Sequence, residues 1–450
     1  MPQAGGGWMI SGEAMNTIEQ RNIWGLLGPE DLFSQRRTRT LGLGAVVRRF
    51  NDLAVPGLGG VWFGKQLFLA TLGVAVAEKV TALGKRFQNI EVANAIEALA
   101  CVLAYETTGW QKDPRLRGRA KMQGKTDHLS FAAVRRPSFY VTQPMRRATV
   151  QPLPALELVK ADGGRFNTFK VGLPENDSDA NISTGMKFIN AVCEHCRPHR
   201  SSVVDVLANW IAGSDKKMST DEMREALSPL KEMPPRARQF LKERLVQNNP
   251  RRRNALTWVD EVRKDQDHDP SLAVQPNAID GEHWRDLRAG TLFFAARAAA
   301  LHLLDKIEEH LGEKTPKSMP LAHTDPIKQE MADLRSKAQA FLDSKYESDL
   351  EATAFCRECS DLSDAEVLKH LVRRDGQGLL LRSGESLVEG GPKFRGFKAD
   401  VGNAEFNTED EGAEADVETS QLFPEHMSPR VTNLYYLNLD LHGKLDDAIK

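Results

Sequence analysis

The chain has 450 residues, 41% of them apolar, and a net charge of -2; this length supports a large core and roughly two to four domains. Five cysteines are too few for a disulfide scaffold, and neither a signal peptide nor an apolar run of membrane-spanning length is recognisable, so we expect a reducing cytoplasm and no membrane contact. The charge is uneven: residues 1–170 carry 23 Lys and Arg against 13 Asp and Glu, a net +10, whereas residues 401–450 carry 3 against 11, a net -8.

The basic front part of the chain points to a polyanionic partner. The alternative is that the two oppositely charged ends neutralise each other.

Residues 56–73, PGLGGVWFGKQLFLATLG, contain two glycines and Lys65 at the G-x-x-x-x-G-K spacing of phosphate-binding loops. The next residue is Gln66, where such a loop needs Ser or Thr to hold magnesium, and bulky residues fill the loop interior. We therefore expect no NTPase. The pattern instead predicts a glycine-rich turn that enters an apolar helix over 65–85, paired with a second helix over 89–106.

The following segment changes character toward β structure. Residues 138–143 read as a strand, residues 145–150 as a short helix, and residues 156–173 as a hairpin around an Asp-Gly-Gly turn. A helix that leads into a two-stranded wing is the outline of a winged helix. Pro152 and Pro154 weaken that interpretation, because each removes a backbone donor where a recognition helix would run.

Arginines and lysines crowd this part of the chain and form the candidate nucleic-acid-binding surface. Basic side chains neutralise phosphates, and nearby aromatic residues such as Phe139 and Tyr140 can stack on bases. Solvated surface charge is the alternative. The candidate residues are Arg115, Arg117, Arg119, Lys121, Lys125, Arg135, Arg136, Arg146 and Arg147.

The rest of the chain reads as helical and then mixed. After a helix-rich block, residues 376–398 read as hairpins, residues 407–420 as an acidic disordered stretch and residues 431–441 as a final strand. The expected fold class is mainly α with small β-hairpins, in several domains. These domains are the basic helical region 1–173, the helical domain 185–350 and the C-terminal α+β segment 351–450.

Four of the five cysteines form two C-x-x-C pairs, Cys193 with Cys196 and Cys356 with Cys359. Each pair can turn two thiolates toward one ion, and two pairs complete the tetrahedral set of a structural zinc site. We expect one shared zinc that staples the helical core between the pairs. Two separate sites, a redox pair and ordinary buried cysteines are the alternatives.

Residues 297–302, RAAALH, place Arg297 and His302 at R-x4-H spacing on a predicted helix. This stretch resembles the R-x4–6-H motif of all-helical ribonucleases of the HEPN type. The resemblance implies an arginine that grips phosphate and a histidine that assists proton transfer to or from the 2′-hydroxyl. The apolar surroundings equally fit a core helix with a hydrogen-bonded histidine.

The sequence therefore predicts a zinc-stabilised protein that binds DNA or RNA without chemistry of its own. We expect it to act as a subunit of a larger bacterial assembly, in a defence or mobile-element setting. One alternative is a HEPN-like ribonuclease that uses Arg297 and His302. Another is a protein-interaction scaffold whose charged ends meet partner subunits.

Overall fold

The structure is a computed structural model, and it describes residues 39–125, 129–173, 182–213, 218, 220–265, 270–313, 317–376, 378–390 and 422–449. The fold is mainly helical, with 61% helix, 4% strand and small antiparallel sheets. The predicted mainly α class is thus confirmed. The features below belong to the compact unit Arg39–Lys450. The predicted acidic stretch 407–420 lies outside the described residues.

The helices vary from single turns to one of 32 residues. Short 3-10 helices occur at η1 (Met145–Thr149), η2 (Phe166–Thr168), η4 (Pro198–Arg200) and η5 (Asp325–Ile327). The α-helices are α2 (Gly44–Ala54), α3 (Gly64–Ala82), α4 (Asn89–Thr108), α5 (Arg119–Met122), α6 (Phe131–Val134), α7 (Pro152–Ala155), α8 (Thr184–Val192), α9 (Val203–Ile211), α10 (Asp221–Leu227), α11 (Pro235–Val246), α12 (Pro250–Lys264), α13 (Gly281–Gly312), α14 (Lys328–Asp343), α15 (Leu350–Ser360), α16 (Asp364–Asp375), α17 (Pro429–Leu441) and α18 (Leu445–Ala448).

The described strands form two small antiparallel sheets. In the first, β1 (Lys160–Ala161) pairs with β2 (Phe169–Lys170), so the hairpin predicted over 156–173 is confirmed. The second has the order β3-β5-β4, with β3 at Ser318–Pro320, β4 at Leu379–Arg382 and β5 at Ser386–Glu389. The β4–β5 hairpin falls within the range predicted over 376–398.

Two strands expected from the sequence are wrong. Residues 138–143 form turns and bends, and residues 431–441 lie in helix α17. In α17 the buried residues surround the helix on nearly every side, so the apolar pattern suits either period. The helix start decides the matter: Ser428 caps the N-terminus and a proline occupies the first turn.

The predicted winged-helix element consisted of a helix and a two-stranded hairpin, and in the described chain the hairpin forms. The expected helix over 145–150 is the five-residue 3-10 helix η1, and the four-residue α7 follows it. Pro152 stands at the start of α7, where its missing N–H costs nothing. A recognition helix long enough to enter a groove therefore does not form between residues 145 and 155.

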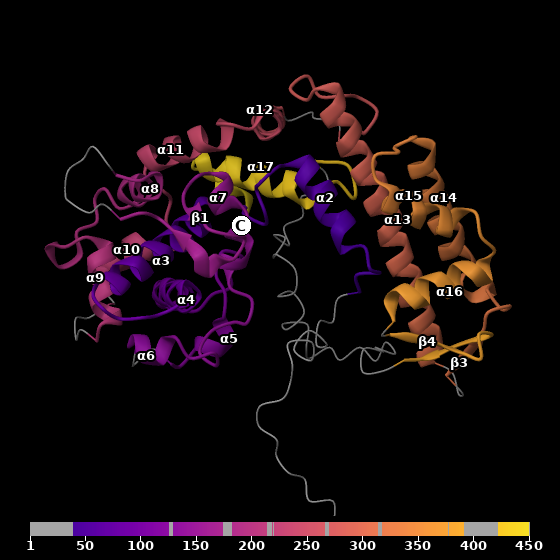
Figure 1. The fold of residues 1–450 in the computed structure, drawn as a ribbon, viewed down its shortest axis with the longest axis horizontal. Helices are drawn as coiled ribbons and strands as arrows, with labels where there is room; N and C mark the ends of the chain where they lie inside the picture. The colour runs from indigo at the N-terminus through magenta and orange to yellow at the C-terminus, as the bar shows by residue number, and fades with distance from the viewer. Residues whose placement is uncertain are drawn as a thin grey trace, which may run out of the picture. The chain divides into compact units, whose positions relative to one another are not determined.

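The first core is built around the helical hairpin α3–α4, as predicted from the two apolar runs. Both helices are apolar on all sides and are buried accordingly. They approach closely at Gly73, where an added Cβ would lie 2.5 Å from the Cβ of Ala93. Figure 1 shows α17 beside α11 and α12, and α17 contacts both although they are distant in sequence.

The second core is formed by α2 and the segment from α13 to β5. Its centre is aromatic: Phe50 stacks on Phe293 at 5.3 Å between ring centroids, and Phe341 meets both rings edge-on. Of the described helices, α13 is the one long and apolar enough to cross a membrane. Of its most apolar window, 61% is buried within the structure, which is typical of a core helix.

Candidate functional site

The basic segment, which we define as residues 114–150, is attached to α4 by a buried carboxylate. Glu97 of α4 is 2% exposed and accepts hydrogen bonds from Tyr140 Oη (2.8 Å), Met145 N (2.6 Å) and Arg146 N (2.9 Å). Burial raises the pKa of Glu97, and these three bonds partly offset that rise. The segment lacks long helices, so this anchor holds it in place on a rigid element.

Two of the nine predicted phosphate-binding residues serve the fold instead. Arg115 is buried and pairs with Asp113 at 2.8 Å and with Asp446 at 2.5 Å. Arg146 is also buried; its Nε donates to an asparagine of α4, and its guanidinium lies 4.9 Å from the ring centroid of Phe166. A phosphate would have to displace these partners, so both residues are structural.

The other seven basic side chains remain at or near the surface. Lys125, Arg135, Arg136 and Arg147 are exposed. Arg135 forms a 3.4 Å ion pair with Glu91, whereas the other six form no ion pair with any carboxylate that the structure describes. The half-buried residues are Arg117, Arg119 and Lys121. Because the segment carries nine basic residues and a single acid, its positive charge is largely uncompensated locally.

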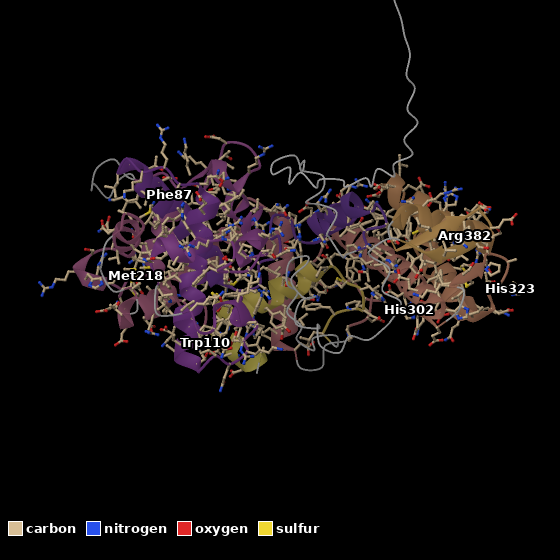
Figure 2. The ribbon with its side chains drawn as sticks, turned by 90° about the horizontal axis from the view of Figure 1, so that it is seen from below. Phe87, Trp110, Met218, His302, His323 and Arg382 are labelled. Atoms are coloured by element: carbon tan, nitrogen blue, oxygen red, sulfur yellow. The ribbon has the colours of Figure 1, made fainter. Side chains whose placement is uncertain are left out.

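The structure adds a neighbour that the sequence analysis missed, the loop 83–88 between α3 and α4. Its Phe87, labelled in Figure 2, is half-buried. The ring of Phe87 meets that of Phe131 edge-on, with 5.0 Å between the ring centroids. The guanidinium of Arg135 lies over both rings, 5.4 Å and 5.8 Å from their centroids. We call these three residues the arginine–aromatic cluster. In the sequence, the only sign that this loop could join the basic surface was the pair Lys85 and Arg86 immediately before Phe87.

The two C-x-x-C pairs belong to different cores. Cys193 and Cys196 pack in the first core, and Cys356 and Cys359 in the second. Across the described parts of the chain, no group of three or more His, Cys, Asp and Glu side chains is placed to hold a metal ion. The shared zinc therefore stays a prediction from spacing, without a gathered ligand set to support it.

The backbone around the two pairs also differs. Cys193 caps the C-terminus of α8, and the Cys196 amide donates to the Cys193 carbonyl at 2.9 Å, which closes a turn. Cys356 and Cys359 lie inside α15 and are almost fully buried. Burial raises the pKa of Cys193 to about 12 and that of Cys359 to about 12. All five cysteines are free thiols.

The polar groups of the glycine-rich turn before α3 form hydrogen bonds with other groups of the chain. Gln66 Oε1 accepts from the amide of Trp62 at 2.9 Å and from the next amide along, and Gly64 N donates to Asp440 Oδ2 at 2.8 Å. Lys65 is 3% exposed, and its Nζ donates to a backbone carbonyl at 2.9 Å. These amides are bonded to the chain's own side chains and are not offered to a phosphate.

Arg297 and His302 both lie on α13 but do not share a face. Residues five apart are separated by about 140° around an α-helix. Arg297 is half-buried and donates from Nη2 to the Arg39 carbonyl at 3.3 Å, whereas His302 is exposed (Figure 2). The helix therefore does not bring the two side chains together.

Comparisons with known proteins give no further guide. No protein-family model matches the chain, and no curated protein or solved structure is significantly similar to it. Function therefore has to be argued from the residues themselves.

Proposed function

We propose that the protein binds nucleic acid through the basic segment and the adjoining loop 83–88. The observation that supports this most is a set of six basic side chains, exposed or half-buried, that form no ion pair with any described carboxylate. A protein gains little by leaving so many like charges together unless a polyanion neutralises them.

The anchoring of the segment suits this role. Glu97 fixes the chain from Tyr140 to Arg146, and the exposed residues Arg136 and Arg147 flank that fixed stretch. Side chains on a fixed backbone lose less conformational entropy on binding than those on a free loop. The basic segment can therefore present its charges in a defined arrangement.

The form of the segment indicates which part of the nucleic acid it contacts. Its α-helices, α5 and α6, have four residues each, too short to read bases from the major groove. Arginine and lysine on short helices and turns contact the phosphate backbone instead, and such contacts are independent of sequence. We therefore expect strong dependence on salt and weak preference among sequences.

The test is fluorescence anisotropy with labelled DNA and RNA over a series of salt concentrations. The triple variant Lys125→Ala, Arg136→Ala and Arg147→Ala removes three exposed charges from the segment. If each contacts a phosphate, the slope of log K against log salt becomes shallower by about 2–3, and affinity near 0.1 M salt falls by about 10- to 100-fold or more.

A matched control removes three exposed charges elsewhere, with Arg253→Ala, Lys328→Ala and Arg382→Ala. We expect this control to keep most of the affinity and the salt slope, because these residues lie outside the segment. Equal losses in both triple variants would show that only net charge matters. An unchanged affinity in the first variant would refute the proposal.

A further inference from the structure

The arginine–aromatic cluster presents a partly exposed surface beside the loop 83–88. Phe87 is half-buried, and 41% of the Arg135 side chain is exposed. The guanidinium of Arg135 lies over the Phe87 ring, 5.4 Å from its centroid. We propose that this cluster stacks an unpaired nucleobase and thereby selects single-stranded nucleic acid, a step that rests on the proposed function of the basic segment.

Phe131 supports the cluster from the interior of the protein. It is 5% exposed, and its ring meets that of Trp210 edge-on with 5.4 Å between the centroids. The indole of Trp210 is fixed in turn, because its Nε1 donates to the Leu129 carbonyl at 2.7 Å. The Phe87 ring and the Arg135 guanidinium therefore rest on a fixed base, 5.0 Å and 5.8 Å from the centroid of Phe131.

Glu91 orients the guanidinium and leaves part of it exposed. Its Oε1 accepts from Arg135 Nη1 at 3.4 Å, and its Oε2 accepts from the Gln88 amide at 3.0 Å, at the start of α4. The carboxylate is thus fixed by the helix that carries it. A side chain that is already held in place loses less conformational entropy when a ligand binds. Arginine also has a delocalised planar group that stacks, which lysine lacks.

Exposed charges flank the cluster along the chain. Arg86 precedes Phe87 and Arg136 follows Arg135; both arginines are exposed and form no ion pair with a carboxylate in the described parts of the chain. Proteins that bind single strands combine positive charges, which follow the phosphate backbone, with aromatic side chains on which the bases stack. The cluster and its two flanking arginines provide both kinds of contact in one place.

Stacking requires a base with a free face, and this requirement distinguishes a single strand from a duplex. Inside a duplex both faces of a base are covered by its neighbours, and freeing one of them costs unstacking and unpairing energy. A single strand offers unstacked bases. Every base has a π face, so stacking adds affinity without a sequence preference. The weak sequence preference expected of phosphate contacts is therefore kept.

The alternative is that the cluster only packs the loop 83–88 against α6. Two conservative substitutions separate this alternative from base stacking. Phe87→Leu keeps an apolar side chain but removes the aromatic face. Arg135→Lys keeps the positive charge beside Glu91 but removes the planar group. A packing role would tolerate both changes, whereas a stacking role would not.

The experiment measures fluorescence anisotropy of the full chain with labelled probes of about 15 nucleotides. The probes are oligothymidylate, oligouridylate, a DNA strand built only of abasic units and a DNA duplex. The abasic strand carries the same phosphates as oligothymidylate but no bases. We expect the wild type to bind the abasic strand more weakly than oligothymidylate by about 5- to 150-fold for each base that is stacked. Oligouridylate shows whether the preferred strand is RNA or DNA.

The variants locate the effect at the cluster. Phe87→Leu and Arg135→Lys should each weaken binding to the preferred single strand by about fivefold or more. Affinity for the abasic strand and the duplex, and the slope of log K against log salt, should stay as in the wild type. Phe294→Leu changes a half-buried phenylalanine of the second core, and Arg382→Lys an exposed arginine of β4; these matched controls should keep wild-type affinity for every probe.

The outcomes separate this inference from the proposed function. Equal affinity of the wild type for oligothymidylate and the abasic strand would overturn base stacking and leave binding through charge intact. Cluster variants that lose no single-strand affinity, or lose it equally on the abasic strand, would also overturn it. Absence of binding to every probe would instead refute the proposed function itself. Circular dichroism shows whether each variant is folded, and the comparison of wild-type affinities decides the question if one is not.

Discussion

Asp440 offers a quantitative test of the packing between α17 and the start of α3. Its carboxylate accepts the Gly64 amide at 2.8 Å in a buried position. Burial raises the pKa of Asp440 to about 6 from a reference value of 3.8, despite the Gly64 bond and the positive charges of Arg115 and Lys65. The folded protein therefore holds this proton over a pH range in which the unfolded chain has lost it.

The sign of the effect follows from proton linkage. Between pH values of about 4 and 6 the folded state binds more protons than the unfolded state at this site, so the free energy of unfolding falls as the pH rises. One pKa unit corresponds to about 1.4 kcal/mol, and the shift from 3.8 to about 6 thus removes about 3 kcal/mol of stability at neutral pH. The Asp440→Asn variant keeps an oxygen acceptor for Gly64 but cannot ionise.

We expect Asp440→Asn to match the wild type near pH 4 and to be more stable by as much as about 3 kcal/mol above pH 7. Urea unfolding followed by tryptophan fluorescence measures the difference at each pH; Trp62 reports on the site through its contact with Tyr436 of α17. Asp447→Asn removes an exposed carboxylate from the neighbouring α18 and serves as the control. A variant less stable than the wild type at pH 7.5 would refute the reasoning, because the ionised carboxylate would then contribute more than its burial costs.

Three further changes test other parts of the structure. Gly73→Ala forces a Cβ to within 2.5 Å of the Ala93 Cβ and should destabilise the protein by about 1–3 kcal/mol in urea unfolding; a higher unfolding midpoint would contradict the close approach of α3 and α4. Glu97→Ala removes the shared acceptor of three hydrogen-bond donors and should lower the free energy of unfolding by about 3–5 kcal/mol. Limited proteolysis should then begin in the basic segment, and a variant as resistant to protease as the wild type would contradict the anchoring role of Glu97. His302→Ala should leave stability within about 0.5 kcal/mol and RNA turnover unchanged in a gel assay; cleavage lost with this substitution would establish the ribonuclease alternative.

Helices with an unambiguous apolar pattern could be predicted from the sequence. The α3–α4 hairpin follows from two long apolar runs, and the hairpin β1–β2 from its Asp-Gly-Gly turn. The apolar residues of the final helix α17 are too frequent to select one period, so the apolar pattern alone could not tell it from a strand. The signal for a helix was at its start, where Ser428 caps the N-terminus and Pro429 occupies the first turn.

The candidate site was predictable only in composition. The positive charge of residues 114–150 is visible in the sequence, but the roles of individual arginines are not. Arg115 is structural because Asp446, more than 300 residues away, lies 2.5 Å from it. The arginine–aromatic cluster likewise needs Phe87 and Phe131 to meet; Phe87 lies in the loop before α4, and Phe131 begins α6, which follows α4 in the chain.

The two C-x-x-C pairs show why spacing alone leaves the chemistry open. Both pairs have the same spacing and similar burial, so one motif predicts the same ligand set for each. In α15 the helix fixes the β-carbons too far apart for a disulfide and surrounds the sulfurs with apolar side chains. After α8 the chain has left the helix at Cys193, and the Cys196 amide closes a turn on the Cys193 carbonyl. The backbone conformation at each pair is set by the element that contains it, and the spacing of the two cysteines does not predict it.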